Sequence, residues 1–259
     1  YGPETVDEIG RTLIDQSEQL LRQRLRELPD GRWESRQYID VRGEIYRILL
    51  AMTKRDDHLT FDFTGSSPQS ETYGINCSYW AVLGALFGPL FPLLAYDITW
   101  NAGLLRAVKM IAPEGTVINA TRPAPTSCAT VCGVQSVNNA STTVLSKMLL
   151  ASKKYARQAT GVWHGTLHAL FLFGINQQGL ETIGFQTEAF SGSGGARTFA
   201  DGVDLGGELV NPICRMANVE TTEESFAVRY LFRRRMRDSA GAGKFRGGLS
   251  LIRDFRVLA

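Results

Sequence analysis

The spacing of apolar residues divides the chain into segments with a helical period and segments with a strand-like period. Between residues 3 and 28, apolar side chains recur at intervals of three and four, which places them on one helical face. Pro29, Asp30 and Gly31 then supply the chemistry of a turn. We therefore expect an amphipathic helix of about seven turns at ~3.6 residues per turn. Its apolar face comprises Val6, Ile9, Leu13, Leu20, Leu21, Leu25 and Leu28.

Elsewhere apolar and polar residues mostly alternate with a period of two, which is typical of half-buried strands. The alternation over residues 33–63, interrupted by the polar residues 54–57, predicts an antiparallel hairpin. Residues 107–111 and 116–118 flank Pro113, Glu114 and Gly115 and predict a second hairpin. Further strands are expected over 162–190, with a turn at 174–179, over 226–232 and over 254–259.

Two more helices complete the predicted fold. Residues 79–96 read as a buried helix that Asn76 caps and that Pro89 and Pro92 break near its end. Residues 136–157 carry a broad apolar stripe and end in cationic residues. The predicted class is α+β, mainly antiparallel sheet with about three helices packed on it. We expect residues 1–32 to be a helix continuing from a missing N-terminal half, and residues 33–259 to be a mixed α+β core.

Composition narrows the class of protein. The formal net charge of +2 leaves no excess of Lys and Arg to neutralise phosphates, which argues against a nucleic-acid partner. No stretch reaches the roughly 18 apolar residues of a membrane helix. The four cysteines, without a secretory segment, favour reduced thiols in a cytoplasmic protein. A start without Met and an end within a predicted strand suggest a fragment of a longer polypeptide.

Two glycine-rich runs, residues 191–197 and 238–248, are the strongest candidates for a functional site. Glycine permits positive φ angles and lets main-chain N–H groups converge on a carboxylate, a phosphate or a developing oxyanion. Tight turns between strands are the alternative interpretation. Neither run has the spacing of a Walker loop or of a dinucleotide-binding fingerprint, so we expect no nucleotide site built by this chain alone.

Other constellations carry weaker signals. His164 and His168 lie four residues apart, as do Cys128 and Cys132, but the histidines fall in a strand-like segment, and we assign no metal to these residues. Gly192, Ser193 and Gly194 do not form a nucleophile elbow. Two sets of carboxylates are read as solvated loop charges rather than acid–base pairs: Asp201 with Asp204, and Glu220 with Glu223 and Glu224.

Four motifs occur together in one order along the chain. They are Phe-Asp-Phe-Thr-Gly-Ser-Ser-Pro-Gln at 61–69 with Asn76, Ile-Ala-Pro-Glu-Gly-Thr at 111–116, Gly-Ser-Gly-Gly-Ala-Arg at 192–197, and Asp-Ser-Ala-Gly-Ala-Gly-Lys-Phe-Arg-Gly-Gly at 238–248. In this combination the chain resembles the hydantoinase B / 5-oxoprolinase superfamily, which includes subunits of N-methylhydantoinase and acetophenone carboxylase. Residues 212–220 are similar to the carboxylase-like branch. Family members are considerably longer than this chain.

The resemblance implies ATP-dependent chemistry shared with a partner. A hydantoinase A-type subunit with ATP and Mg would phosphorylate a carbonyl oxygen, and this type of chain would direct water, or CO2 from bicarbonate, to the activated intermediate. It also implies a divalent metal, such as zinc or manganese, held by Asp and His in the missing N-terminal half. We therefore expect a hetero-oligomer that takes a small-molecule substrate.

Three hypotheses follow from the resemblance. The first is a segment of a hydantoinase B-type subunit that opens a cyclic amide such as a hydantoin or 5-oxoproline. The second is a subunit of an acetophenone- or acetone-type carboxylase, and the third is a non-catalytic scaffold or docking segment. We expect Arg197 and Asp62 to be catalytic, with Thr64 and Asn76 orienting the substrate. Gly192, Gly194 and Gly195 would bind an oxyanion or a phosphorylated intermediate.

Overall fold

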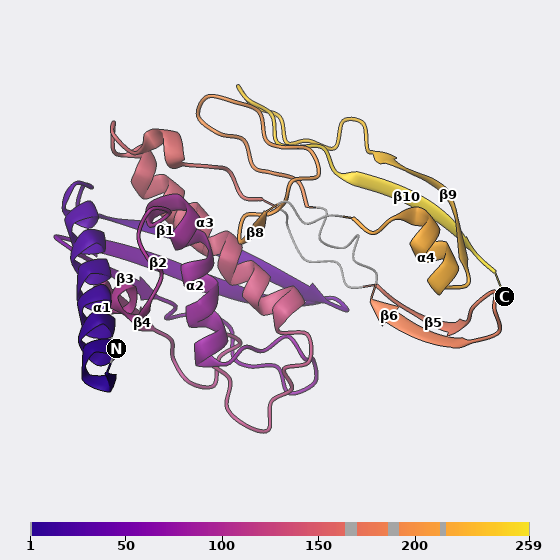
Figure 1. Ribbon diagram of the computed structural model, residues 1–259, viewed down its shortest axis with the longest axis horizontal. Helices are drawn as coiled ribbons and strands as arrows, with labels where there is room; N and C mark the ends of the chain where they lie inside the picture. The colour runs from indigo at the N-terminus through magenta and orange to yellow at the C-terminus, as the bar shows by residue number, and fades with distance from the viewer. Residues whose placement is uncertain (1, 164–169, 186–191, 213–215, 259) are drawn as a thin grey trace. The chain divides into compact units, whose positions relative to one another are not determined.

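The computed structural model describes residues 2–163, 170–185, 192–212 and 216–258 (Figure 1). Packing divides the chain into two compact units, Tyr1–Ala159 and Thr160–Ala259. The N-terminal helix belongs to the first of these units, and the boundary expected after residue 32 stays a prediction. Each unit is considered by itself below.

A four-stranded sheet forms the centre of the first unit. Strands β1 (Gly31–Val41), β2 (Glu44–Arg55) and β3 (His58–Asp62) form an antiparallel meander, and β4 (Val108–Ile111) pairs in parallel with β3. The predicted hairpin over 33–63 thus contains a further turn, at Arg42 and Gly43, which both adopt positive φ. The turn after Arg55 was predicted correctly.

The second predicted hairpin, over 107–118, is wrong. Strand β4 pairs with β3 instead, in the register Phe61 with Met110, because the intervening helices carry the chain back across the sheet. Thr116 makes only isolated bridges, to Pro68 and to Asn119. The sheet is therefore mixed rather than purely antiparallel.

Two helices pack together over the sheet and close the core. Helix α3 (Gln135–Leu150) contacts β1 and β2, and α2 (Tyr79–Leu94) packs on α3 (Figure 1). Alternate residues of β2, including Ile48, Leu50 and Met52, are buried, as the period of two requires. Helix α2 continues through Pro89 and Pro92, so the predicted break is wrong. Ser78, and not Asn76, caps it by accepting a hydrogen bond from the Ala81 N–H.

Shorter helical turns flank these helices. A 3₁₀ turn, η1 (Ala102–Ala107), precedes β4, and a π-helical turn, η2 (Thr130–Val134), leads directly into α3. A second 3₁₀ turn, η3 (Ala156–Gln158), contains the end of the predicted helix over 136–157, which the structure stops at Leu150.

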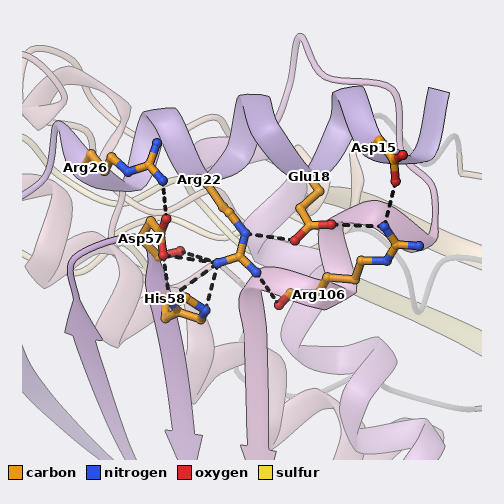
Figure 2. Close-up of polar contacts among 7 residues, drawn as sticks. All are labelled: Asp15, Glu18, Arg22, Arg26, Asp57, His58 and Arg106. Atoms are coloured by element: carbon orange, nitrogen blue, oxygen red, sulfur yellow. Dashed lines mark hydrogen bonds and ion pairs between the residues drawn. The ribbon is translucent and has the colours of Figure 1, made fainter. Parts of the chain in front are cut away.

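The amphipathic N-terminal helix is confirmed as α1 (Pro3–Arg26), with Leu21 and Leu25 fully buried. An ionic network ties its polar side to the turn before β3 and to η1 (Figure 2). Arg22 lies 2.9 Å from Glu18 and 3.1 Å from Asp57, and Arg106 lies 3.1 Å from Glu18. Hydrogen bonds from Arg106 and Arg22 lower the pKa of Glu18. The network also includes Asp15, Arg26 and His58.

The second unit consists of small two-stranded sheets and connecting loops. Strand β5 (Phe171–Ile175) pairs with β6 (Glu181–Phe185), β7 (Gly207–Glu208) with β8 (Asn211–Pro212), and β9 (Val228–Arg235) with β10 (Leu251–Val257), all antiparallel. A short helix that the pattern did not predict, α4 (Val219–Ser225), begins at Asn218, whose side chain accepts a hydrogen bond from the Glu220 N–H. The α+β class with mainly antiparallel sheet is confirmed.

Candidate functional site

The two glycine-rich runs of the sequence meet in one pocket of the second unit. The pocket has a volume of about 400 Å³. The first run contributes Ser193, Gly194, Gly195 and Ala196, the second contributes Ser239, Gly241, Ala242, Phe245, Gly247 and Gly248, and the remaining wall is Gly161, Val162, Trp163 and Ser250. The resemblance between the runs in sequence is therefore matched by their proximity in space.

Close main-chain packing explains why glycine stands at these positions. The Gly194 N–H donates to the Val203 carbonyl over 2.8 Å, and the Gly248 N–H donates to the Gly194 carbonyl over 2.8 Å. A Cβ atom on Gly202 would lie 2.0 Å from the Gly194 oxygen, and one on Gly195 would lie 2.1 Å from the Gly161 oxygen. Any side chain at Gly195 or Gly202 would thus collide with main-chain atoms that cannot turn aside.

The expected use of positive φ angles by these glycines is wrong. Gly194, Gly195, Gly241 and Gly248 all lie outside the left-handed region, whereas the neighbouring Leu205 and Gly207 lie within it, at φ values of 50° and 85°. Glycine is needed here for the approach of one segment to another. The two runs therefore form a layer of closely packed main chain rather than a set of left-handed turns.

Two adjacent main-chain donors in this pocket lack acceptors in the described part of the chain. The Gly194 N–H is engaged by Val203, but the N–H groups of Gly195 and Ala196 donate to no acceptor among the described residues. Unpaired N–H groups at the wall of a pocket are available to a ligand oxygen, and neighbouring donors of this kind stabilise negative charge. Gly195 and Ala196 thus carry the main-chain donors of the pocket wall that are unpaired among the described residues.

The rest of the pocket wall is polar but uncharged. The hydroxyls of Ser193 and Ser250 lie 3.3 Å apart, and the Ser250 N–H donates to the Ser239 hydroxyl over 2.8 Å. Trp163, which is 8% exposed, and Phe245 add aromatic surface. No charged side chain lines the pocket among the residues described, so its recognition of a ligand depends on hydrogen bonds and shape.

Arg197 and Gly192, two of the predicted site residues, lie next to this pocket without lining it. The Arg197 N–H donates to the Ala200 carbonyl over 3.0 Å, and the Gly192 carbonyl accepts a hydrogen bond from the Gly207 N–H over 3.1 Å. The roles proposed for both residues stay predictions. Of the predicted residues in this run, Gly194 and Gly195 are the ones at the pocket.

A carboxylate cluster fixes the loops that carry the pocket. Asp204 lies 2.9 Å from Arg246 and 2.9 Å from Arg235, and it accepts a hydrogen bond from the Leu249 N–H. The Leu249 N–H and then Arg246 lower the pKa of Asp204 to about 2. Asp201 accepts a hydrogen bond from the Arg246 N–H. The prediction of a solvated loop charge is therefore wrong for Asp204, which is 17% exposed and paired with Arg246, whereas the side chain of Asp201 is 52% exposed.

Asp62 and Thr64 lie in a groove of the first unit. This groove, of about 270 Å³, opens on the sheet face opposite the buried residues and includes Arg32, Glu34 and Arg36. Asp62 accepts a hydrogen bond from the Thr64 N–H over 2.9 Å, which shapes the turn after β3. The register aligns Glu34, Ala51 and Asp62 across three strands, so the small Ala51 side chain forms the floor of the groove between two carboxylates.

Asn76 is fully buried and organises the loop before α2. Its side-chain oxygen accepts a hydrogen bond from the Ser70 N–H, and its NH₂ group donates to the carbonyls of Ser70, Tyr73 and Pro125. Because the Asn76 amide is hydrogen-bonded to main-chain groups through both its oxygen and its nitrogen, Asn76 would affect a substrate through the shape of the loop.

Sequence reasoning missed Glu208. This residue of β7 is 6% exposed, and its Oε1 atom has no hydrogen-bond partner in the described part of the chain. Burial raises the pKa of the Glu208 carboxyl. The N–H of the preceding residue, Gly207, donates to the Gly192 carbonyl, so Glu208 lies one residue from a contact with the first glycine run. A single glutamate between glycine and leucine carries no pattern that distinguishes it in the sequence.

The remaining candidates do not assemble into a recognisable centre. Cys77 is buried, and desolvation raises the pKa of its thiol to about 12, whereas Cys128 is exposed. His164, His168 and Cys214 lie outside the described residues. Among the residues that the structure describes, no three His, Cys, Asp or Glu side chains form a group that could hold a metal ion. None of the described helices is long and apolar enough to cross a membrane.

Comparison with known proteins identifies related chains. The family model "Hydantoinase B/oxoprolinase" matches residues 1–259. A chain of Pseudomonas sp. (strain NS671) that bears the name of a D-/L-hydantoinase B-type subunit is 29% identical over the whole of this chain and 44% of its own length. The acetophenone carboxylase delta subunit of Aromatoleum aromaticum (strain EbN1) is 23% identical over 96% of this chain and 36% of its own.

A solved structure shares the fold. The ATP-dependent caprolactamase from Pseudomonas jessenii superposes with a TM-score of 0.82 at 24% identity, covering 99% of this chain and 44% of that one. The chain thus spans less than half the length of the relatives that it matches.

Proposed function

Because the chain belongs to the hydantoinase B/oxoprolinase family, we propose that it forms part of the hydantoinase B-type subunit of an ATP-dependent enzyme that hydrolyses a cyclic amide. The observation that carries the proposal is the pocket between the glycine runs, where the N–H groups of Gly195 and Ala196 are adjacent and unpaired among the described residues. Two such donors suit the carbonyl oxygen of an amide, on which negative charge grows as water attacks.

The residues of the pocket have distinct roles in this proposal. The two N–H groups bind the carbonyl oxygen, and the hydroxyls of Ser193, Ser239 and Ser250 hydrogen-bond to the ring. Trp163 and Phe245 pack against its flat faces. In the overall reaction one cyclic amide, ATP and two waters give the ring-opened acid, ADP and phosphate: the ring C–N bond breaks and its nitrogen takes a proton.

The nucleotide is assigned to a partner subunit of the hydantoinase A type. The described pocket wall lacks charged side chains, and neither glycine run has the spacing of a phosphate loop, so these residues do not fit the phosphates of ATP. We assign no step to a metal on this chain, since its described residues provide no group of ligands. Arg197, directly after Ala196, is proposed to strengthen the field at the two donors.

The alternative function is carboxylation of a ketone in the manner of acetophenone or acetone carboxylases. It is favoured by the similarity to the acetophenone carboxylase delta subunit. The similarity over residues 212–220 adds little, because Asn218 within this segment has a structural role as the cap of α4. Both functions require stabilisation of an oxygen anion, so the pocket alone favours neither.

The test is ATP hydrolysis by the full-length protein together with its co-purifying partner. We expect hydantoin or 5-oxoproline to stimulate release of ADP without bicarbonate, and the ring-opened acid to accumulate in step with it. Stimulation by acetophenone that depends on bicarbonate would replace the proposal with the carboxylase function. The absence of stimulation by any of these compounds would contradict both and favour the scaffold hypothesis.

A further inference from the structure

A chain of buried hydrogen bonds lies behind the two free donors of the pocket. The Trp163 indole N–H donates to the Thr160 hydroxyl oxygen over 3.0 Å, and that hydroxyl donates to the Gly195 carbonyl over 3.3 Å. Thr160 and Trp163 are 6% and 8% exposed. Next to these two hydrogen bonds, the Gly161 N–H donates to the Ala196 carbonyl over 2.7 Å.

These contacts fix the planes of the peptides that carry the donors. In a trans peptide the C=O and N–H groups point in opposite directions, and among the described residues the single cis bond is Arg122–Pro123. The bond from Thr160 to the Gly195 carbonyl therefore turns the Ala196 N–H away from Thr160. In the same way, the bond from Gly248 to the Gly194 carbonyl turns the Gly195 N–H away from Gly248.

We propose that Thr160 is a positioning residue: its hydroxyl, held by the Trp163 indole, orients the peptide between Gly195 and Ala196 so that the Ala196 N–H meets the ligand oxygen. The proposal rests on the function proposed above. It assigns to Thr160 an effect on the charged transition state, since a donor held in a fixed direction stabilises a developing charge without reorganisation. Ground-state binding depends less on one donor and changes little.

The glycine at 161 supports this arrangement. A Cβ atom at Gly195 would lie 2.1 Å from the Gly161 oxygen, and one at Gly161 would lie 3.4 Å from the Ala196 nitrogen. Segment 160–163 is thus packed directly on the peptides that it orients. Because of this tight contact the Gly195 carbonyl lies beside Thr160. The Thr160 hydroxyl donates the hydrogen bond that this buried carbonyl needs.

The experiment compares Thr160→Val, which has the same shape without a hydroxyl, with Thr160→Ser, which retains it. In the full-length protein with its partner we expect Thr160→Val to lower kcat roughly tenfold with less than about a twofold change in KM, and Thr160→Ser to restore most of the loss. Crystal structures should show the 195–196 peptide rotated in Thr160→Val and unchanged in Thr160→Ser.

Thr222→Val is the matched control. Thr222 is 5% exposed, and its hydroxyl likewise donates to a main-chain carbonyl, that of Asn218, but within α4. The Thr222→Val variant should lose about as much stability as Thr160→Val, without a change in kcat. If kcat falls equally in Thr160→Val and Thr222→Val, lost stability explains the effect and the proposal is overturned.

A further variant separates this proposal from the function on which it rests. Replacing Ala196 by its α-hydroxy acid counterpart converts the peptide to an ester and removes the N–H itself. If the ester leaves turnover intact, the proposed function of the pocket fails. If the ester lowers kcat while Thr160→Val changes neither kcat nor the orientation of the peptide, the role of Thr160 alone is refuted. The orientation of the 195–196 peptide in a crystal structure of Thr160→Val tests whether Thr160 positions this peptide, and this test needs no known substrate.

Discussion

The first unit buries side chains, whereas the second packs main chain against main chain. In the first unit the sheet and helices enclose large apolar residues, among them Leu25, Ile48, Phe61 and Leu86, at zero exposure. In the described part of the second unit, Trp163 and Val228 are the buried apolar side chains. Its glycine segments instead approach so closely that a single added methyl group would overlap a carbonyl.

The difference shows how each unit can serve a site. A core of interlocking side chains gives stability and a rigid platform. Packed glycine segments bury little apolar area but leave main-chain groups uncovered, which is what the pocket at Gly195 and Ala196 requires. Exposed apolar residues on β5 and β6, such as Phe173 at 83% and Ile183 at 79%, show how little of the second unit's apolar surface is enclosed within it.

Removing a large core side chain should produce the largest effect. Phe61 is fully buried in β3, so Phe61→Ala should lower the free energy of unfolding of the first unit by about 3–5 kcal/mol. Phe173→Ala is the control in the second unit, and because Phe173 is exposed it should stay within about 0.5 kcal/mol of wild type. Denaturant titration followed by hydrogen exchange measures the free energy of unfolding of each unit separately. Equal losses of stability in Phe61→Ala and Phe173→Ala would mean that Phe173 is buried in the full-length protein.

Adding one methyl group should damage the second unit nearly as much. A Cβ at Gly202 would lie 2.0 Å from the Gly194 oxygen and 2.6 Å from the Gly248 nitrogen, so Gly202→Ala should cost about 3 kcal/mol. Gly241→Ala, at the pocket wall but with no described atom within 4 Å of the new Cβ, should change stability little. Exchange rates of residues 192–207 and 239–250 would report the loss, and similar rates in both variants would rule out packing as the reason for glycine.

The first unit was the more predictable one, for a physical reason. Side-chain burial leaves a period in the sequence, so α1, the turn after Arg55 and the α+β class could be predicted. The parallel pairing of β4 could not, because it depends on how the intervening helices return the chain to β3. Nor could the continuation of α2 through Pro89 and Pro92, where packing on α3 outweighs the local preference of proline.

The sequence predicted which glycine runs form the candidate site, but not which of their groups are open to a ligand. The similarity of the two glycine runs pointed to one site, and they share a pocket. Which N–H groups stay unpaired among the described residues depends on tertiary partners, such as the Val203 carbonyl that accepts from the Gly194 N–H, so the choice of Gly195 and Ala196 required the structure. Thr160 and Glu208 stand alone in sequence, and their roles come from tertiary contacts.

The smallest expected effect concerns the buried carboxyl of Glu208. Its pKa is raised by desolvation, so the folded state favours the protonated form more than the unfolded state does. Stability is then greatest below the unfolded pKa of about 4.5 and falls as the pH rises toward the folded pKa, because ionisation is easier in the unfolded chain. Glu208→Gln should therefore stabilise the second unit by about 1 kcal/mol at pH 7.

This gain should shrink as the pH approaches 4.5, since protonated glutamate and glutamine are then equivalent in charge. Unfolding measured between about pH 5 and pH 8 would reveal the trend, with Glu181→Gln as a control because Glu181 is exposed on β6. A constant difference at every pH would exclude titration of Glu208 as its origin. If Glu208→Gln is instead less stable at pH 7, the carboxylate has a partner outside the described residues.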